Sequence, residues 1–441
     1  MRASAWLPTM SERPTAMPAG RLRRTAKVGG LLGGEVTKAY ATKAANLLRS
    51  EDDRTAANER RRLEAADHIV EVLGQMKGPA MKLGQMASIL DLGERVADLF
   101  AEFNPDAVAA ASIGQVYRAR LHDGRQVAVK VQYPRVGSAV RADLQNLGLI
   151  MRAAKRFAPG LDPATTASEL RERISEELDY EHEAQAQRAF ARRWRGHPFI
   201  VIPGVVTSMC RDRVLVTEWI DGVGFKEMRA APQATRDRIG EIVLRFYLGS
   251  LYRFGTFSGD PHPGNFRLMA DGRVAFLDFG MTKTVSRTRI DRELDVIRAA
   301  LEQDADAVHA GLAALGFFEL DDPRFEPALV LEHVRAINAW YTDDKPVTLS
   351  PQYVSTLLAH AGDPRSKYWD LTRNETIPAE SLLSSRMQVM TLAAIGQLGA
   401  TTNWHRVMSE WLYGSVPTSP LGLAEAEFFD ASVTLSTAQA A

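Results

Sequence analysis

The segment that runs from Gly259 to Gly280 constrains this chain more than any other stretch of it. It reads GDPHPGNFRLMADGRVAFLDFG, with an Asp-x4-Asn arrangement at Asp260 and Asn265 that is followed by Asp278. The mostly apolar run Arg273–Leu277 predicts a short buried strand that would deliver Asp278 from a rigid base. Converging carboxylate and amide oxygens suit a magnesium ion that bridges phosphates, because hard cations prefer oxygen ligands. The segment therefore predicts a metal-phosphate site.

The same spacings occur in protein kinases, where an Asp precedes an Asn in the catalytic loop and a later Asp-Phe-Gly supplies a second metal ligand. A matching upstream half lies between Ala109 and Pro134, where alternating apolar residues predict a loop, a strand, a tight turn and a second strand. Lys130 ends a Val-Ala-Val-Lys, close to the kinase Val-Ala-Ile-Lys whose ammonium pairs with nucleotide phosphates. We therefore expect Lys130 to bind phosphates.

An alanine-rich loop precedes the first of these strands. It follows the kinase pattern Gly-x-Gly-x-x-Gly-x-Val, with alanine in place of two glycines. Alanine resists the positive φ angles that glycine allows. We therefore expect the backbone amides of this loop to have fewer ways to approach phosphates than those of a glycine-rich loop. We assign the whole loop to nucleotide binding: Ala109, Ala110, Ala111, Ser112, Ile113, Gly114, Gln115 and Val116.

An acidic run, EELDYEHE, offers carboxylate partners for Lys130 on a helix predicted over 167–194. At about 100° per residue the acids divide between two faces. Glu176, Asp179 and Glu183 share one face, and Glu177 and Glu181 share the other. We expect Glu183 to pair with Lys130.

A further strand is predicted over Arg213–Ile220, ahead of a turn at Asp221-Gly222. If the likeness to kinases extends this far, Glu218 and Ile220 lie at a hinge between two lobes that would hydrogen-bond an adenine through its backbone. The alternative is an ordinary buried strand followed by a turn.

Taken together, these motifs resemble the UbiB/AarF group, the atypical, protein-kinase-like proteins of ubiquinone biosynthesis. The resemblance covers about residues 60 to 415. The matching residues occur in the order of that group: Lys82-Leu83-Gly84-Gln85, Ala109–Gly114, Lys130, Glu177-Leu178-Asp179 with Glu183, Asp260-Pro261-His262-Pro263-Gly264-Asn265, and Asp278-Phe279-Gly280.

The resemblance implies an α+β, two-lobed protein-kinase-like fold with an N-terminal helical extension and a mostly helical C-lobe. On this basis we expect residues 21–105 to form the extension, 106–222 the N-lobe and 223–441 the C-lobe. Residues 1–20 are rich in Pro, Ser and Thr and lack a continuous apolar core, so we expect a disordered tail there.

It also implies a role for each matching residue. Lys130 binds phosphates, Asp260 acts as the catalytic base or orients the nucleophile, and Asn265 and Asp278 hold Mg²⁺. The regulatory residues implied by the resemblance belong to the extension or to the acidic helix: Lys82, Gln85, Glu177 and Asp179.

One position departs from the family pattern. Most kinases, and this family, have His two residues before the catalytic Asp, whereas this chain has Ser258. That His usually braces the loop against the Asp-Phe-Gly backbone, and serine is shorter and has no ring to pack.

Two functions therefore stay open. The first is an ATP-dependent enzyme, a kinase or ATPase acting in isoprenoid-quinone or lipid metabolism. The second is a nucleotide-binding pseudokinase that serves as a scaffold.

The composition of the chain indicates which partners and which cellular compartment to expect. Lys plus Arg and Asp plus Glu both number 54, so net charge gives no reason to expect a nucleic-acid partner. The single cysteine, Cys210, is expected to be a buried small residue. The uncharged stretch 387–404 is expected to be a buried helix and not a membrane span. We therefore expect a cytoplasmic protein whose membrane contact, if any, is peripheral.

Overall fold

The computed structural model describes residues 96–111, 113–133, 178–362 and 365–440, all within the compact unit Lys82–Ala441. Several predictions concern residues outside these ranges and stay predictions: the tail 1–20, the extension up to residue 95 with Lys82 and Gln85, the loop residue Ser112, and the acids Glu176 and Glu177.

Five short strands form the first sheet. After helix α4 (Val96–Leu99), the strands β1 (Glu102–Phe103), β3 (Gly114–Arg120), β4 (Gln126–Gln132) and β6 (Val214–Glu218) lie in that order, and β2 (Ala109–Ala110) pairs with β3. All neighbours are antiparallel. The predicted turn is present, with Gly124 at φ 88°. The predicted period of two is confirmed, because the alternating apolar residues are buried: Tyr117, Ala119, Leu121, Val127, Val129 and Val131.

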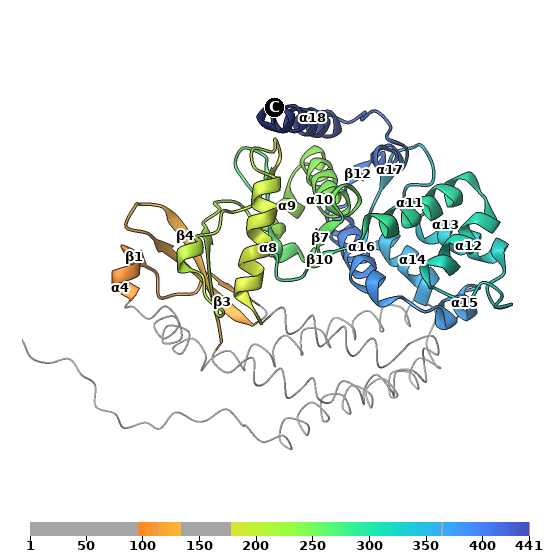
Figure 1. Cartoon of the computed structure of the whole chain (residues 1–441), viewed down its shortest axis with the longest axis horizontal. Helices are drawn as coiled ribbons and strands as arrows, with labels where there is room; N and C mark the ends of the chain where they lie inside the picture. Colours follow the sequence, from red (N-terminus) through yellow and green to blue (C-terminus); the bar gives the residue numbers. More distant parts are fainter. Residues whose placement is uncertain (1–95, 112, 134–177, 363–364, 441) are drawn as a thin grey trace, which may run out of the picture. The chain divides into compact units, whose positions relative to one another are not determined.

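Helix α8 (Tyr180–Arg193), labelled in Figure 1, packs against β6. The prediction of one continuous helix over 167–194 is wrong at residue 179. Asp179 has an extended backbone, with φ −110° and ψ 96°, and its side chain accepts hydrogen bonds from the amides of Glu181 and His182. Asp is a preferred N-cap because it satisfies amides that lack a partner within the helix. Asp179 therefore begins α8 and shares no helix face with Glu183.

Two small sheets hold the segments that flank Asp260 and Asp278. Strand β7 (Thr256–Ser258) pairs antiparallel with β10 (Thr282–Thr284). Strand β9 (Val274–Phe276) confirms the short buried strand predicted before Asp278, and it lies between β5 (Ile200–Val201) and β8 (Phe266–Leu268). A backbone hydrogen bond of 2.9 Å from the Leu277 amide to the Asn265 carbonyl then links the end of β9 to the loop that follows β7.

The rest of the described chain is mostly helical. Helix α10 (Gln233–Phe254) ends at Gly255, whose φ of 67° suits a glycine cap. The mostly helical character expected of residues 223–441 is present in the described part of that range. Besides α10, the helices described in this range are α9 (Phe225–Ala230), α11 (Arg287–Glu302), α12 (Ala305–Leu315), α13 (Pro327–Ile337), α14 (Pro351–Gly362), α15 (Trp369–Asn374), α16 (Ala379–Leu398), α17 (Trp404–Tyr413) and α18 (Pro420–Ala440). A short ladder, β11 (Val347–Thr348) with β12 (Thr401–Thr402), joins α13–α14 to α16–α17.

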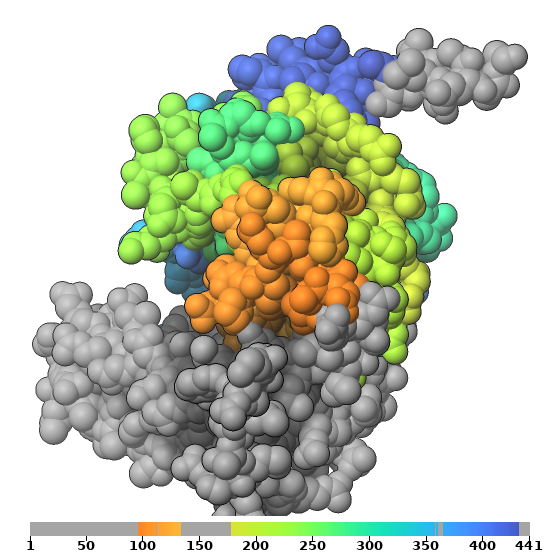
Figure 2. Space-filling view, turned by 90° about the vertical axis from the view of Figure 1, so that its left-hand side faces the viewer, coloured from red at the N-terminus to blue at the C-terminus, as the bar shows by residue number. Residues whose placement is uncertain are grey.

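The sheet and the helices each have an apolar core. The sheet core contains Val127 and Val129, and the larger helical core is built around α10, where Phe246 stacks on Phe276 at 3.8 Å between ring centroids. Helix α16 packs along α10. Figure 2 shows residues 96–133, in orange, adjoining the yellow-green residues that follow residue 178. Cys210 is 5% exposed, as expected for a buried small residue. The α+β class is confirmed.

The uncharged stretch 387–404 is divided between two helices. It covers the end of α16, a cap at Gly399 and the first residue of α17. Met387, Ile395 and Leu398 are fully buried in the helical core, as the prediction of a buried helix requires. Within the described ranges, every helix is either too short or too polar to cross a membrane.

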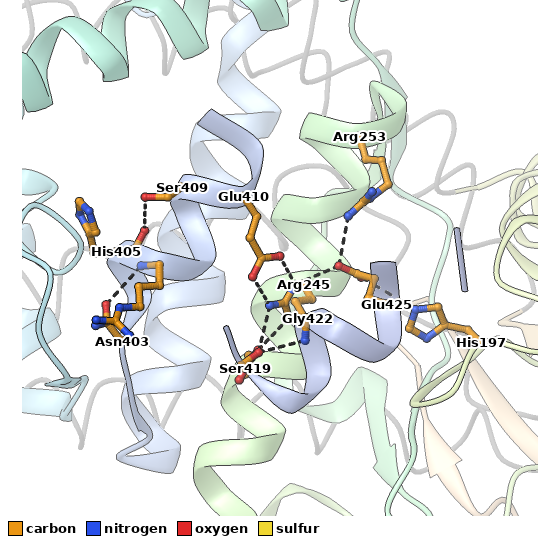
Figure 3. Close-up of polar contacts among 12 residues, drawn as sticks. His197, Arg245, Arg253, Asn403, His405, Ser409, Glu410, Ser419, Gly422 and Glu425 are labelled. Carbon is orange, nitrogen blue, oxygen red and sulfur yellow. Dashed lines mark hydrogen bonds and ion pairs between the residues drawn. The ribbon is translucent and has the colours of Figure 1, made fainter. Parts of the chain in front are cut away.

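A buried ion network joins α10, α17 and α18 (Figure 3). Arg245 has no exposed side-chain surface and binds Glu241 at 2.8 Å, Glu410 at 2.7 Å and Glu425 at 3.0 Å. Glu425 also binds Arg253 at 3.2 Å. Buried carboxylates are costly unless they are paired, so this network requires all three helices to keep their positions.

Candidate functional site

Lys130 lies at the centre of the candidate site. It projects from the face of β4 opposite to the valines of the sheet core, because successive side chains of a strand alternate. Its Nζ lies 2.9 Å from both carboxylate oxygens of Glu183 on α8 and 3.4 Å from Oδ2 of Asp278. The ammonium also lies over the ring of Tyr180, 4.9 Å from its centroid. The predicted ion pair between Lys130 and Glu183 is confirmed, and Asp278 joins it.

The charges of this cluster depend on its burial. Lys130 is 16% exposed and Glu183 is 2% exposed at their side chains. Burial alone would lower the pKa of Lys130, but the carboxylates of Asp278 and Glu183 outweigh burial and raise that pKa well above its usual value. Burial raises the pKa of Glu183 to about 7, although Lys130 opposes this shift. Lys130 is therefore a fixed cation at neutral pH.

The alanine-rich loop is a tight hairpin in the described residues. Ala109 pairs with Val116, Ala110 pairs with Gln115, and the Ala111 amide donates to the Gly114 carbonyl at 2.9 Å. Gly114 is required by space, because a Cβ there would lie 2.3 Å from the Val131 carbonyl oxygen. The alanines keep negative φ angles, since Gln303 is the one non-glycine residue with a positive φ among those described. The hairpin thus lies on the sheet that carries Lys130.

Asp260 and Asn265 contact each other in the loop that follows β7. The Asn265 Nδ2 donates to the Asp260 carboxylate at 3.0 Å and to the Asp260 carbonyl at 3.1 Å. Asn265 ends a single turn, η2 (Pro263–Asn265), whose preceding His262 accepts from the Gly264 amide at 3.0 Å. Because Nδ2 faces Asp260, the amide oxygen of Asn265 remains as an acceptor for another partner.

Asp278 and Phe279 face different surroundings. The Asp278 side chain is 29% exposed, and its Oδ1 accepts from the Gly280 amide at 3.1 Å. Phe279 has no exposure and packs on Phe190 of α8, 4.9 Å between ring centroids. The apolar ring thereby fixes the backbone that aims Asp278 at Lys130.

Ser258 replaces part of what the family histidine is expected to do. Its hydroxyl, on a residue only 1% exposed, donates to the Asp278 carbonyl at 3.1 Å. The adjacent Gly259 amide donates to the Met281 carbonyl at 2.6 Å. The loop after β7 is therefore braced against the Asp-Phe-Gly backbone by a shorter side chain that makes a hydrogen bond in place of ring packing.

The predicted hinge lies at the end of β6. The Glu218 side chain is exposed and accepts from the Gly204 amide at 2.9 Å, and its own amide donates to the Gly204 carbonyl at 2.8 Å. The next amide, of Trp219, donates to the Gln126 carbonyl at 3.0 Å. Ile220 follows with a half-buried side chain. Adenine contacts by Glu218 and Ile220 stay a prediction.

Two residues that sequence reasoning missed contact the loop at Asp260. Arg386 on α16 lies 3.2 Å from Oδ1 of Asp260 and donates to the Gly259 carbonyl at 2.8 Å. Tyr247 on α10 donates to the Asp260 carbonyl at 3.4 Å, and burial raises the pKa of its phenol well above the usual value. Neither belongs to a local motif, so no spacing in the sequence pointed to them.

The donor set fits a magnesium ion bound mainly through a substrate. The described residues contain no group of three or more His, Cys, Asp and Glu side chains that would hold a metal without other ligands. Asp278 and Asn265 offer one carboxylate and one amide, both hard oxygen ligands. Mg²⁺ is often held by one or two protein oxygens while phosphates and waters complete its shell. With Lys130 beside it, such an ion would sit in a site suited to a polyphosphate.

Comparison with known proteins shows which family and which relatives this chain is similar to. The model of the ABC1 atypical kinase-like domain matches residues 75–311, more than half of the chain. The chain is 30% identical over 345 residues to the mitochondrial atypical kinase COQ8B of Rattus norvegicus, covering 68% of this chain and 64% of the relative. It is 35% identical over 237 residues to the chloroplastic protein Activity of BC1 complex kinase 1 of Arabidopsis thaliana, covering 52% of this chain and 35% of the relative. The chain thus spans less than two thirds of the length of these curated relatives.

A solved structure aligns over more of the chain. It is described as the complex of Rv3197 with erythromycin from Mycobacterium tuberculosis, and the alignment has a TM-score of 0.64 at 27% identity. The alignment covers 88% of this chain and 98% of that chain.

Proposed function

The chain belongs to the ABC1 atypical kinase-like family, as its motifs predict, and on this premise we propose that it binds ATP with Mg²⁺ and transfers or hydrolyses the γ-phosphate. The family and the solved neighbour give it a kinase-like fold. In this proposal the first sheet and α8 form an N-lobe, and the helices from α10 onward form a C-lobe. The nucleotide lies between the two.

The observation that carries the proposal is the grouping of Lys130, Glu183 and Asp278. A lysine held between two carboxylates could exchange the Asp278 contact for phosphate oxygens if Asp278 served as a ligand of Mg²⁺. Asp260 lies next to Asn265, so the proposed base and the second metal ligand are held together. We assign Lys130 to phosphate binding, Asn265 and Asp278 to Mg²⁺, and Asp260 to orienting or deprotonating the nucleophile.

The pathway is proposed from the relatives. Two of them are named atypical kinases COQ8B and coq-8, and this supports an action in isoprenoid-quinone or lipid metabolism. A peripheral contact with a membrane fits such a role. Regulation by Lys82 and Gln85 on the extension, with Glu177 and Asp179 as acidic partners, remains part of the proposal. The Asp179 side chain, however, is already engaged as the cap of α8.

The alternative is a nucleotide-binding scaffold without turnover. Its main support in the sequence is Ser258, and the hydrogen bond from Ser258 to the Asp278 carbonyl weakens that support. The simultaneous presence of Lys130, Asp260, Asn265 and Asp278 favours the enzyme.

Phosphate release from ATP tests the choice between these functions. Purified protein with ATP and Mg²⁺ is expected to release phosphate, with and without a lipid or quinone-like additive. Asp260→Asn is expected to abolish release while ATP binding is kept, because Asp260 is assigned to the nucleophile and not to the nucleotide. Binding without release under every condition would favour the scaffold, and equal release by Asp260→Asn would reject the role of that carboxylate.

A further inference from the structure

Helix α16 closes over the loop that carries Asp260. A Cβ on Gly259 would lie 2.7 Å from a methyl carbon of Leu383, so only glycine lets the helix approach this closely. Leu383 is buried in the helical core. Packing therefore holds the backbone of the helix in place relative to the loop that carries Asp260.

Arg386 is the next residue on this face of α16. The loop between Asp260 and Asn265 reads Pro-His-Pro-Gly and contains no lysine or arginine, so the cation beside Asp260 comes from Arg386, 126 residues further along the chain. One guanidinium nitrogen lies 3.2 Å from Oδ1 of Asp260, and the other donates to the Gly259 carbonyl at 2.8 Å. These two contacts fix both the carboxylate and the backbone before it.

The contacts leave room for a reacting group at Asp260. Its Oδ1 faces Arg386 and its Oδ2 accepts from Asn265, and a carboxylate oxygen can accept two hydrogen bonds. The Asp260 side chain is 25% exposed. A hydroxyl group can therefore still donate to this carboxylate.

A pocket of about 350 Å³ lies next along the same helix face. Met390, Ala393 and Gln397 continue the spacing of Arg386 on α16 and line one side of it. The other side is formed by residues that directly follow Asp260 in the chain: Pro261, His262 and Pro263. The volume falls within the usual range for small-molecule sites, and the lining combines the apolar side chains of prolines, alanines and Met390 with the polar side chains of His262 and Gln397.

We infer that α16 forms the acceptor side of the proposed phosphotransferase site. Arg386 is a positioning residue for Asp260, and the pocket takes the apolar body of a molecule whose hydroxyl group reaches the Asp260 carboxylate. This inference rests on the proposed function. In the reaction, the acceptor hydroxyl gives its proton to Asp260 as its oxygen bonds to the γ-phosphorus. The bond from the γ-phosphorus to the bridging oxygen breaks, and the electron pair leaves with ADP.

Transfer of labelled γ-phosphate to two alcohols tests the class of acceptor. Farnesol, an isoprenoid alcohol, is expected to be phosphorylated, and glycerol, which has no apolar body, is not. Ala393→Phe should fill the pocket and lower transfer to farnesol by about tenfold or more while the affinity for Mg-ATP is unchanged. Val389→Phe is the matched control, because Val389 lies on α16 with 40% exposure and does not line the pocket.

Two substitutions at Arg386 test its role. Arg386→Gln should lower kcat by about 10- to 100-fold without changing the affinity for ATP, because it loosens Asp260 and touches no nucleotide. Arg386→Lys should restore part of kcat, since it keeps the positive charge. Unchanged kcat in Arg386→Gln would overturn the positioning role.

The possible outcomes distinguish a failure of this inference from a failure of the proposed function. A protein that binds Mg-ATP and releases phosphate, yet transfers none to farnesol or transfers equally in Ala393→Phe, would overturn the acceptor pocket alone. A protein that binds no ATP would overturn the proposed function and the inference with it.

Discussion

Replacing Glu183 by Gln removes the negative charge that this side chain carries above its pKa of about 7, and it leaves the shape of the buried cluster at Lys130 unchanged. In the wild-type protein Nζ of Lys130 lies 2.9 Å from both oxygens of Glu183 and 3.4 Å from Asp278. The amide oxygen of Gln can keep one hydrogen bond, so one charge-assisted bond of about 1.5–3 kcal/mol is lost. Lys130 would then pair with Asp278, which is the proposed metal ligand.

If that energy is lost from nucleotide binding, Glu183→Gln should bind Mg-ATP roughly 10- to 150-fold more weakly, since about 1.4 kcal/mol is a factor of ten. Isothermal titration calorimetry measures the change directly. Glu410→Gln is the matched control, because Glu410 is 6% exposed and binds Arg245 at 2.7 Å outside the candidate site. Affinity within twofold of the wild type in folded Glu183→Gln would refute the reasoning. An equal loss in Glu410→Gln would attribute the effect to general loosening.

Three further changes probe the brace, the ion network and a buried histidine. Ser258→Ala should lower phosphate release roughly two- to tenfold, because it removes one neutral hydrogen bond to the Asp278 carbonyl; unchanged release would exclude a bracing role. Arg245→Met should lower the free energy of unfolding in urea by about 3–5 kcal/mol, because three buried carboxylates lose the cation they share, although Glu425 keeps Arg253. Arg406→Met, at a half-exposed pair, should cost about 1 kcal/mol or less. Burial, with Arg253 and Arg245, lowers the pKa of His197 to about 3. Below pH 6.5 the unfolded chain therefore binds a proton that the folded chain does not, and stability should fall by up to about 1.4 kcal/mol per pH unit down to pH 3. His197→Gln should remove that part of the slope, and an identical slope in both proteins would contradict it.

The sequence predicted the parts of the site that depend on short-range patterns. The alternation around Lys130 predicted two strands, and the acidic run on the predicted helix supplied Glu183 as the chosen partner of Lys130. The same reasoning misplaced Asp179, because an Asp ahead of a helix can equally belong to a helical face or cap its N-terminus. Which of these occurs depends on where the backbone turns, and charge periodicity does not report that.

Long-range contacts set the limit of prediction. Arg386 reaches Asp260 across 126 residues, and Arg245 reaches Glu425 across 180 residues. Such pairs arise from how helices pack, and no local spacing marks them in one sequence. Ser258 shows a related limit, because its shorter side chain still reaches the Asp278 carbonyl through a backbone position fixed by the pairing of β7 with β10.

The dependence of ATP affinity on Mg²⁺, measured in the wild type and in Asp278→Asn, tests the central claim most directly. The claim is that Lys130 and the oxygens of Asn265 and Asp278 hold one metal-bound triphosphate. We predict that Mg²⁺ tightens ATP binding by about tenfold or more in the wild type, at least about 1.4 kcal/mol, and that Asp278→Asn loses this gain. Equal ATP affinity with and without Mg²⁺ in the wild type, or a full gain in Asp278→Asn, would contradict the account.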